Sequence, residues 1–276
     1  MPIHKIHHLD CGTMCPLAGS LMGSPGHFWQ RGHLVSHCLL VESDDGLILI
    51  DTGMGTDDLC PDSRLPAMYR FLSKPPLDGP TALSHVLRLG YSPGDVRHIL
   101  VTHLDLDHAG GISDFPNATV HILDSELRAA ENPAKGEKMR YVRDQWENAN
   151  WQEYSGTGGD DWFGFTSVRP VTALGDELAI IPLPGHSPGH CGIAIRGPSN
   201  WFLHAGDAFF HRNDIGQEKT PWGIRVFQNK VDSDRALRIQ NTTRLRELHA
   251  TKSSEVTIFC SHDPIQLEDC INSVSR

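Results

Sequence analysis

The chain has 276 residues, of which 39% are hydrophobic and 21% are charged, a balance typical of a folded globular protein. A chain of this length can bury a substantial core, so we expect residues 1–276 to form one compact α/β domain. The 34 acidic and 24 basic residues give a formal net charge of −10, which argues against a basic nucleic-acid groove.

The N-terminal part contains the alternating and continuous apolar runs that are typical of strands. Such runs occupy residues 3–10 and 33–51, and Asp44-Asp45-Gly46 within the second run is a hairpin-turn signal. Residues 80–89 predict a helix with Thr81 as its N-cap.

The apolar run Ile99-Leu100-Val101 leads into a turn rich in metal-binding groups. His103, Asp105, Asp107 and His108 fall within six residues there. Imidazole and carboxylate are ligands for zinc, iron or manganese, and a site built only from them leaves the metal open to water. The alternative is a polar loop with chance histidines, since the chain has 17 of them.

The middle of the chain predicts further regular structure and then an aromatic-rich segment. Residues 119–122 predict a strand, and Asp124 or Ser125 would cap a helix that follows. The aromatic-rich segment is 139–165, which we expect to be accessory to the main fold. Its rings either wall a pocket beside the site or pack an accessory helix onto the sandwich. The candidate substrate contacts are Trp146, Trp151 and Trp162.

Three later segments also pair a short apolar strand with a small-residue turn that carries His or Asp. Residues 170–206 predict a succession of strands, and the turns within and after them contain His186, His190, Asp207 and His262. Strands that enter a sheet in parallel deliver their carboxyl ends to a common edge, where α/β proteins place their chemistry. The four segments together predict a metal site assembled from distant parts of the chain.

Residues 209–229 are long enough to form a lid over such a site. They include Phe210, a candidate substrate contact, and His211, which is either a proton donor or hydrogen-bond partner for substrate or a surface histidine. Residues 233–249 and 266–274 predict helices. Strand-rich segments interleaved with helices in two halves favour a sandwich over a doubly wound sheet.

These motifs resemble those of the metallo-β-lactamase superfamily, which carries His-x-His-x-Asp-His, Gly-His-[Ser/Thr]-x-Gly-His, Gly-Asp and a late His. Here the matching segments are His103 to His108, Gly185 to His190, Gly206-Asp207 and His262, and Leu49 to Gly53 resembles the family's early strand and turn. The resemblance covers nearly the whole chain. It implies an αβ/βα four-layer sandwich of two mixed β-sheets flanked by helices, with a metal site along one edge.

The resemblance also implies a binuclear centre of two divalent metal ions, with zinc expected before manganese or iron. Seven side chains would hold it: His103, Asp105, Asp107, His108, His186, Asp207 and His262. His103 and His186 would bind the first ion. Asp107, His108 and His262 would bind the second, and Asp207 would bridge the two. Asp51 and His190 match positions that support the ligands through hydrogen bonds.

Asp105 departs from the family pattern, which has His at this position. With two divalent ions and a bridging hydroxide, a third carboxylate brings the formal charge of the centre to about zero instead of plus one. A less positive centre is a weaker Lewis acid, and carboxylate favours harder ions such as manganese or iron. Asp105 is either a ligand of the first ion or a solvated carboxylate beside a weakly held ion.

The expected reaction is hydrolysis of a lactone or other carboxylic ester of a small molecule. A hydroxide held between two metal ions would attack the carbonyl, with Asp107 orienting it and Asp207 bridging the ions. The lactonase-like group of the superfamily often has Tyr three residues after the bridging Asp, where this chain has Phe210. The alternatives are a glyoxalase-II-like thioesterase, a diiron oxidoreductase-like protein and a non-catalytic metal-binding sensor.

The sequence also predicts partners and location. The chain begins without an apolar signal segment and has no apolar run near the ~20 residues of a membrane span. Its seven cysteines are scattered and odd in number, which favours reduced thiols in the cytoplasm. We therefore expect a cytoplasmic enzyme with a small-molecule substrate and with neither membrane nor nucleic-acid partners. A homodimer is compatible with the sequence.

Overall fold

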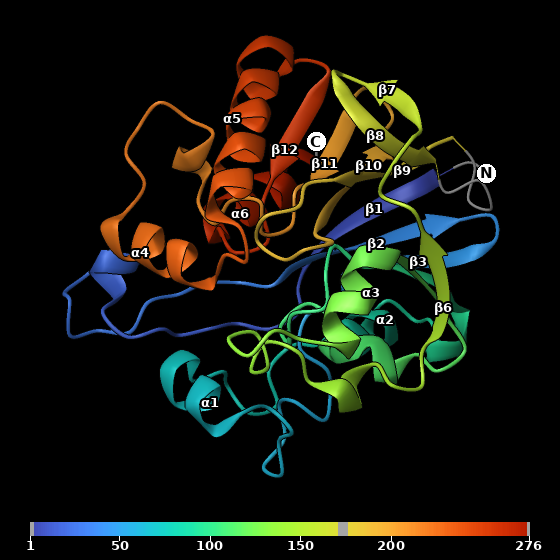
Figure 1. The fold of residues 1–276 in the computed structure, drawn as a ribbon. Helices are drawn as coiled ribbons and strands as arrows, with labels where there is room; N and C mark the ends of the chain where they lie inside the picture. Colours follow the sequence, from blue (N-terminus) through green and yellow to red (C-terminus); the bar gives the residue numbers. More distant parts are fainter. Residues whose placement is uncertain (1–2, 171–175, 275–276) are drawn as a thin grey trace.

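Two six-stranded mixed sheets lie at the centre of the computed structural model, which describes residues 3–170 and 176–274 (Figure 1). The first sheet has the order β1-β2-β3-β4-β5-β6, and the second has the order β12-β11-β10-β9-β8-β7. In the first sheet β3 to β6 are parallel and β1 to β3 antiparallel. In the second, β11 and β12 are parallel and the other neighbours are antiparallel.

The strands of the first sheet are β1 (Ile3–Asp10), β2 (His37–Ser43), β3 (Gly46–Ile50), β4 (Val96–Leu100), β5 (Thr119–Leu123) and β6 (Asn150–Tyr154). Those of the second are β7 (Asp160–Trp162), β8 (Phe165–Pro170), β9 (Leu178–Pro182), β10 (Cys191–Arg196), β11 (Trp201–His204) and β12 (Val256–Phe259). The helices are α1 (Ala67–Ser73), α2 (Ala82–Arg88), α3 (Asp124–Glu131), α4 (Trp222–Val231), α5 (Arg235–Lys252) and α6 (Pro264–Val274).

The central strands are apolar on both faces because each face meets another layer. In β2, Leu39 and Val41 face the cluster shared by the two sheets, whereas Leu40 faces the cluster on the helix side. In β10, Ile193 faces the shared cluster and Ala194 the opposite one. Successive side chains therefore point alternately to one cluster and to the other, with the two-residue period of a strand. This alternation fixes the register of both sheets.

Helices cover the outer face of each sheet. Ala82 and Val86 of α2 and Leu127 of α3 pack on the first sheet, and Leu245 and Leu248 of α5 pack on the second. The result is the four-layer αβ/βα sandwich that was expected, and that prediction is confirmed. None of the helices in the described residues is long and apolar enough to cross a lipid bilayer.

Several local predictions agree with the structure. The strand at residues 3–10 is β1, and the turn at 44–46 joins β2 to β3. Thr81 caps α2, where its hydroxyl accepts a hydrogen bond from the backbone N–H of Ser84 at 3.1 Å. Of the strand region predicted at 170–206, residues 171–175 lie outside the described residues.

Other elements differ from the predictions. The segment 139–165 contains no α-helix, only a short 3₁₀ turn at Arg143–Gln145. It supplies β6 at the edge of the first sheet and β7 at the edge of the second (Figure 1). Aromatic residues favour strands, and both sheets gain an edge strand in this way. Asp124 is the first residue of α3 rather than its N-cap, which is Leu123. The segment expected as a lid contains most of α4, and α1 was not expected.

Candidate metal centre

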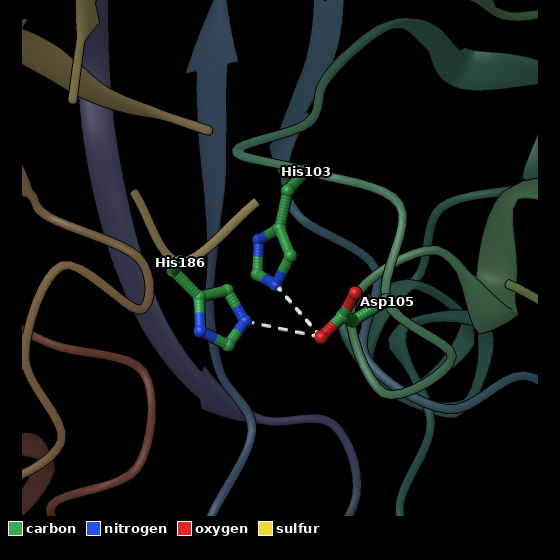
Figure 2. Close-up of side chains that lie close together, drawn as sticks. All are labelled: His103, Asp105 and His186. Atoms are coloured by element: carbon green, nitrogen blue, oxygen red, sulfur yellow. Dashed lines mark hydrogen bonds and ion pairs between the residues drawn. The ribbon is translucent and has the colours of Figure 1, made fainter. Parts of the chain in front are cut away.

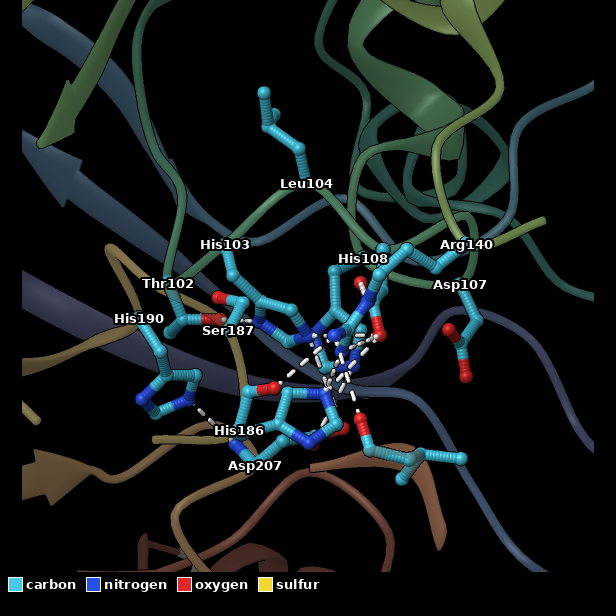
Figure 3. A network of polar contacts seen from close by, with 12 residues as sticks. Thr102, His103, Leu104, Asp107, His108, Arg140, His186, Ser187, His190 and Asp207 are labelled. Atoms are coloured by element: carbon cyan, nitrogen blue, oxygen red, sulfur yellow. Dashed lines mark hydrogen bonds and ion pairs between the residues drawn. The ribbon is translucent and has the colours of Figure 1, made fainter. Parts of the chain in front are cut away.

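Seven side chains with metal-binding groups converge where β4, β9, β11 and β12 end, at one edge of the sandwich. Figure 2 labels His103, Asp105 and His186, and Figure 3 adds Asp107, His108 and Asp207. The parallel pairs β3–β4 and β11–β12 bring their carboxyl ends to this edge. The ligand atoms fall into three overlapping groups in which they lie within 4.8 Å of one another. All seven candidates are included: His103, Asp105, Asp107, His108, His186, Asp207 and His262.

A first cation position lies among His103, Asp105, His186 and Asp207 (Figure 2). Asp105 Oδ2 is 3.6 Å from His103 Nε2 and 3.0 Å from His186 Nε2. Asp207 Oδ2 is 3.8 Å from His103 Nε2 and 3.4 Å from His186 Nε2. Donor atoms that bind a tetrahedral metal at about 2.0–2.1 Å are roughly 3.4 Å apart, so these separations suit one ion.

A second position lies among Asp107, His108, His262 and Asp207. Asp207 Oδ1 is 3.4 Å from His108 Nε2 and 3.1 Å from His262 Nε2. Asp107 Oδ2 is 3.9 Å from His262 Nε2. Asp207 Oδ2 also lies 3.2 Å from His262 Nε2. The buried Asp207 carboxylate thus lies between the two positions and contacts donors of both, the arrangement of a bridging ligand.

Hydrogen bonds orient the imidazole rings. Thr102 donates its hydroxyl to Asp51 Oδ2 at 2.7 Å and therefore accepts from His103 Nδ1 at 2.9 Å. His108 Nδ1 donates to the same Asp51 oxygen at 2.9 Å, and His262 Nδ1 donates to the carbonyl of Val35 at 2.8 Å. When these rings are neutral, the bonds at Nδ1 leave the lone pair of Nε2 facing the cluster, which is how protein partners prepare histidines for a metal.

His190 positions Asp207 through the backbone. Its Nδ1 donates to the carbonyl of Leu183 at 2.9 Å, so its Nε2 accepts the backbone N–H of Asp207 at 2.9 Å. Gly206 makes room for this contact: its φ is +53°, and a Cβ there would lie 2.6 Å from His190 Nε2. The structure thus gives Asp51 and His190 the supporting contacts that the resemblance implied.

The charges of the cluster stabilise one another. Burial would raise the pKa of Asp207, but the positive charges of His262 and His108 outweigh it and hold that pKa well below its usual value. Burial would likewise lower the pKa of His108, but Asp207 and Asp51 raise it well above its usual value. The cluster therefore favours ionised carboxylates next to a positive charge.

The donor atoms fit a metal ion. His103 Nε2, His108 Nε2 and Asp207 Oδ1 are buried and have no hydrogen-bond partner among the described residues. Buried polar atoms nearly always have a partner, so atoms without one that point to a shared position indicate a bound cation. Nitrogen and oxygen donors of this kind suit zinc, manganese or iron.

The sequence did not predict the role of Arg140, which forms an ion pair with Asp105. Its Nε donates to Asp105 Oδ1 at 2.6 Å and its Nη2 to Asp105 Oδ2 at 2.8 Å. Asp105 was expected to be either a metal ligand or a solvated carboxylate. It is not solvated, because its side chain is only 13% exposed and is paired with the Arg140 guanidinium. The ion pair holds the pKa of Asp105 well below its usual value, although burial acts in the opposite direction.

Glu126 of α3 was also missed. Its buried carboxylate accepts hydrogen bonds from the Ser187 hydroxyl at 2.6 Å and from the backbone N–H groups of Gly189 at 3.0 Å and Leu104 at 3.1 Å. It therefore connects the loop that carries His103 to the loop that carries His186. No local pattern marks Glu126 in the sequence, because its partners are distant along the chain.

The predicted substrate contacts separate into two groups. Trp146 and Trp151 pack in the cluster between the first sheet and its helices, and Trp162 packs on the second sheet near α5. The structure therefore shows these three rings in packing roles. Phe210 lies on the ligands, with ring centroids 5.7 Å from His186 and 5.1 Å from His262.

His211 caps a short 3₁₀ turn, Arg212–Asp214, and its Nδ1 accepts the backbone N–H of Asn213 at 3.2 Å. Its side chain is buried, and burial lowers its pKa. His211 is therefore not a surface histidine, which was one of the alternatives expected from the sequence.

The family model described as the metallo-beta-lactamase superfamily matches residues 31–252, and the chain belongs to this superfamily. It is similar to a probable metallo-hydrolase of Mycobacterium tuberculosis, with 38% identity over 266 residues that cover 95% of this chain and 81% of the relative. It also resembles an N-acyl homoserine lactonase of Bacillus thuringiensis, with 26% identity over 98% of this chain and 97% of the relative.

The fold matches a solved structure of the B. thuringiensis lactonase AiiA with N-decanoyl-L-homoserine bound at the active site. The TM-score is 0.72 at 22% identity, over 98% of this chain and 97% of that one. The family and its relatives make this chain a metallo-hydrolase, which confirms the expected enzyme class and favours it over the redox and sensor alternatives.

Proposed function

We propose that this protein hydrolyses a lactone or other carboxylic ester of a small molecule at the metal centre. The observation that carries the proposal is the convergence of ionised carboxylates and free imidazole nitrogens around Asp207, next to an apolar wall. A divalent metal bound there would supply an activated water and polarise the carbonyl of the substrate.

Asp107 is suited to handle the proton of the attacking water. Its side chain is 14% exposed, compared with 3% for Asp207. No hydrogen bond from the described residues reaches its carboxylate, which lies 3.9 Å from the imidazole of His262. Asp107 can therefore accept a hydrogen bond from water and retain the proton while the carbonyl is attacked.

An apolar wall beside the ligands fits the acyl part of such a substrate. Phe210 belongs to a buried cluster with Leu106 of the loop that follows β4, Ile224 of α4 and five residues from the N-terminal third: Met14, Leu34, Met54, Leu59 and Leu65. Tyr69 of α1 packs on this cluster. Burial and the negative charge of Asp107 raise the pKa of Tyr69 well above its usual value, so its hydroxyl stays protonated and can donate to a substrate oxygen.

Lactones are the first candidates because the N-acyl homoserine lactonase relative covers nearly the whole chain. Phe210 has no hydroxyl where the lactonase-like group often has Tyr, and Tyr69 offers one from another element. Because the hydroxyl comes from a different element, we include other lactones and esters among the proposed substrates, as well as acyl-homoserine lactones.

The test is a substrate panel with metal-loaded protein: N-acyl homoserine lactones of several chain lengths, simple γ-lactones, aryl esters, thioesters and a chromogenic β-lactam. We expect turnover of lactones or esters, and loss of that turnover in Asp207→Ala because the shared ligand is gone. Asp95→Ala removes an exposed carboxylate far from the centre and is the control. Turnover of none of the panel by loaded protein, or unchanged turnover in Asp207→Ala, would contradict the proposal.

A further inference from the structure

Arg140 is fixed in place by contacts from both its backbone and its side chain. Its carbonyl accepts the backbone N–H of Leu106 at 2.9 Å, which ties it to the metal-binding loop. All five guanidinium N–H groups have acceptors within reach. Two of these N–H groups donate to Asp105. Nη1 donates to the carbonyls of His186 at 3.0 Å and Val231 at 3.3 Å and to Ser233 Oγ at 3.1 Å.

The remaining donor of Arg140 points at a ligand atom. Nη2 lies 2.8 Å from His186 Nε2. A guanidinium only donates, so His186 Nε2 accepts this hydrogen bond when the ring carries its proton on Nδ1. One imidazole lone pair cannot bind a metal ion while it accepts this hydrogen bond. When the proton is on Nε2, that nitrogen donates to Asp105 Oδ2 at 3.0 Å instead, and it again has no lone pair to offer a metal ion.

Arg140 thus uses two of the four donor atoms that frame the first position, Asp105 Oδ2 and His186 Nε2. The second position differs. No N–H group of the described residues occupies His108 Nε2, and Asp107 accepts no hydrogen bond from them. Within the second position His262 Nε2 hydrogen-bonds, among the described residues, only with another candidate ligand, Asp207 Oδ2, at 3.2 Å. The two positions are therefore unequal, because a cationic side chain occupies donors of the first position and none from the described part of the chain occupies donors of the second.

We propose that the Arg140 guanidinium takes the place of the first metal ion, so that each chain retains one divalent ion, at the second position. This rests on the proposed metal-dependent function and replaces the expectation of two ions. Asp105 is then the partner of Arg140 instead of a metal ligand. The Arg140 guanidinium then provides positive charge in place of the first ion. Because it is part of the chain, it cannot dissociate from the site.

The experiment is metal analysis of protein that has been loaded with excess zinc and then desalted. Wild-type protein should retain about one zinc ion per chain, and Arg140→Met should retain about two, because both His186 Nε2 and Asp105 become free. Arg238→Met is the matched control: Arg238 is a buried arginine that binds Asp232 and Asn229, and the variant should stay at one ion. Circular dichroism and thermal melting check that the variants fold.

Two more variants locate the ion. His262→Ala should lose it, whereas His103→Ala, a change at the first position, should keep it. If Arg140→Met does not fold, a cobalt titration of unmodified metal-free protein tests the same point, with absorbance expected to saturate at one equivalent.

Two ions in wild-type protein would overturn the inference and leave the proposed hydrolysis intact. One ion without turnover of any substrate would support the inference and contradict the proposed substrate class. Protein that retains no ion would overturn both.

Discussion

At the scale of single residues, position 105 shows how one side chain changes the requirements of a buried site. An imidazole there would be neutral, whereas the Asp105 carboxylate brings a charge that must be compensated. Arg140 compensates it from a loop 35 residues further along the chain. Breaking a buried ion pair by removing one partner typically costs about 3–5 kcal/mol, so Arg140 and Asp105 are also important for stability.

His121 gives a test of how buried histidines limit stability in acid. It lies in the first sheet between His98 and Tyr154, with hydrogen bonds of 3.0 and 2.9 Å, and burial and His98 lower its pKa to about 4. The folded state thus favours neutral His121, and its contribution is complete above pH 6.5. As the pH falls from 6.5 to about 4, the unfolded chain binds a proton that the folded chain does not, and stability falls.

We therefore expect the free energy of unfolding of His121→Gln to fall less steeply than that of wild type between pH 6.5 and 4. The difference should reach at most about 3 kcal/mol, from the 1.36 kcal/mol that corresponds to one pKa unit. Urea denaturation at a series of pH values measures it, and subtraction of the wild-type curve removes the contribution of the metal ligands. The exposed His27 serves as the control in His27→Gln. Parallel curves for wild type and His121→Gln would contradict the prediction.

The sequence predicted which residues come together in the candidate metal centre, because each follows an apolar strand and lies in a short turn. It did not predict Arg140 or Glu126, because their roles depend on contacts between loops. Arg140 meets His186 and Ser233, which are 46 and 93 residues away, and no periodicity or motif marks such pairs. The role of Asp105 was left open for the same reason, since its partner could not be known.

At the scale of elements, α3 links the two halves of the site. Glu126 lies in its first turn and accepts hydrogen bonds from the loops of both sheets. Gly189 is required for this approach, because a Cβ there would lie 2.1 Å from the backbone nitrogen of Glu126. The helix therefore sets the distance between the loop that carries His103 and the loop that carries His186.

Replacement of Glu126 by Ala should destabilise the protein and weaken metal binding. Four donors would be left without this acceptor: the Ser187 and Tyr141 hydroxyls and the backbone N–H groups of Leu104 and Gly189. Each buried unpaired group costs about 1–3 kcal/mol, so we expect a loss of more than about 2 kcal/mol. Glu131→Ala changes an exposed residue of the same helix and should have little effect. Chemical denaturation and zinc affinity are the measurements, and equal stability of the two variants would show that Glu126 is dispensable.

Strands were easier to predict than helices. β2 and β3 are buried on both faces, so each appears in the sequence as a nearly continuous apolar run. Such a run is a clear signal for a strand. α1 contains no buried residue, and several of its apolar side chains are exposed: Met68, Phe71 and Leu72. Without a buried stripe there is no periodicity that predicts a helix. Likewise α4 buries only Ile224 and Gln228, so it was expected to be part of a loop.

At the scale of the whole molecule, the metal centre joins the two sheets. His103, Asp107 and His108 follow a strand of the first sheet, whereas His186, Asp207 and His262 follow strands of the second. An ion bound by both sets therefore crosslinks two layers that otherwise meet through apolar side chains. Ligands that bind only the folded state raise its stability by mass action.

Removal of the metal should accordingly lower the melting temperature, and zinc should restore it. Zinc at 100 times its Kd stabilises a folded protein by about 2.7 kcal/mol, which corresponds to a shift of several degrees for a chain of this size. Differential scanning calorimetry after chelation and after zinc addition measures the shift. His262→Ala should show almost no response to zinc. A melting temperature that ignores both treatments in wild-type protein would contradict this prediction.

The bond between His262 Nδ1 and the Val35 carbonyl spans 227 residues of sequence. Its consequence concerns synthesis: a nascent chain that is still missing its last strand lacks both this bond and a ligand of the second position. The chain must therefore be synthesised at least as far as residue 262 before every ligand of the second position is present. Bound metal would then mark a chain that extends past β12, and products terminated before β12 would lack one of its ligands.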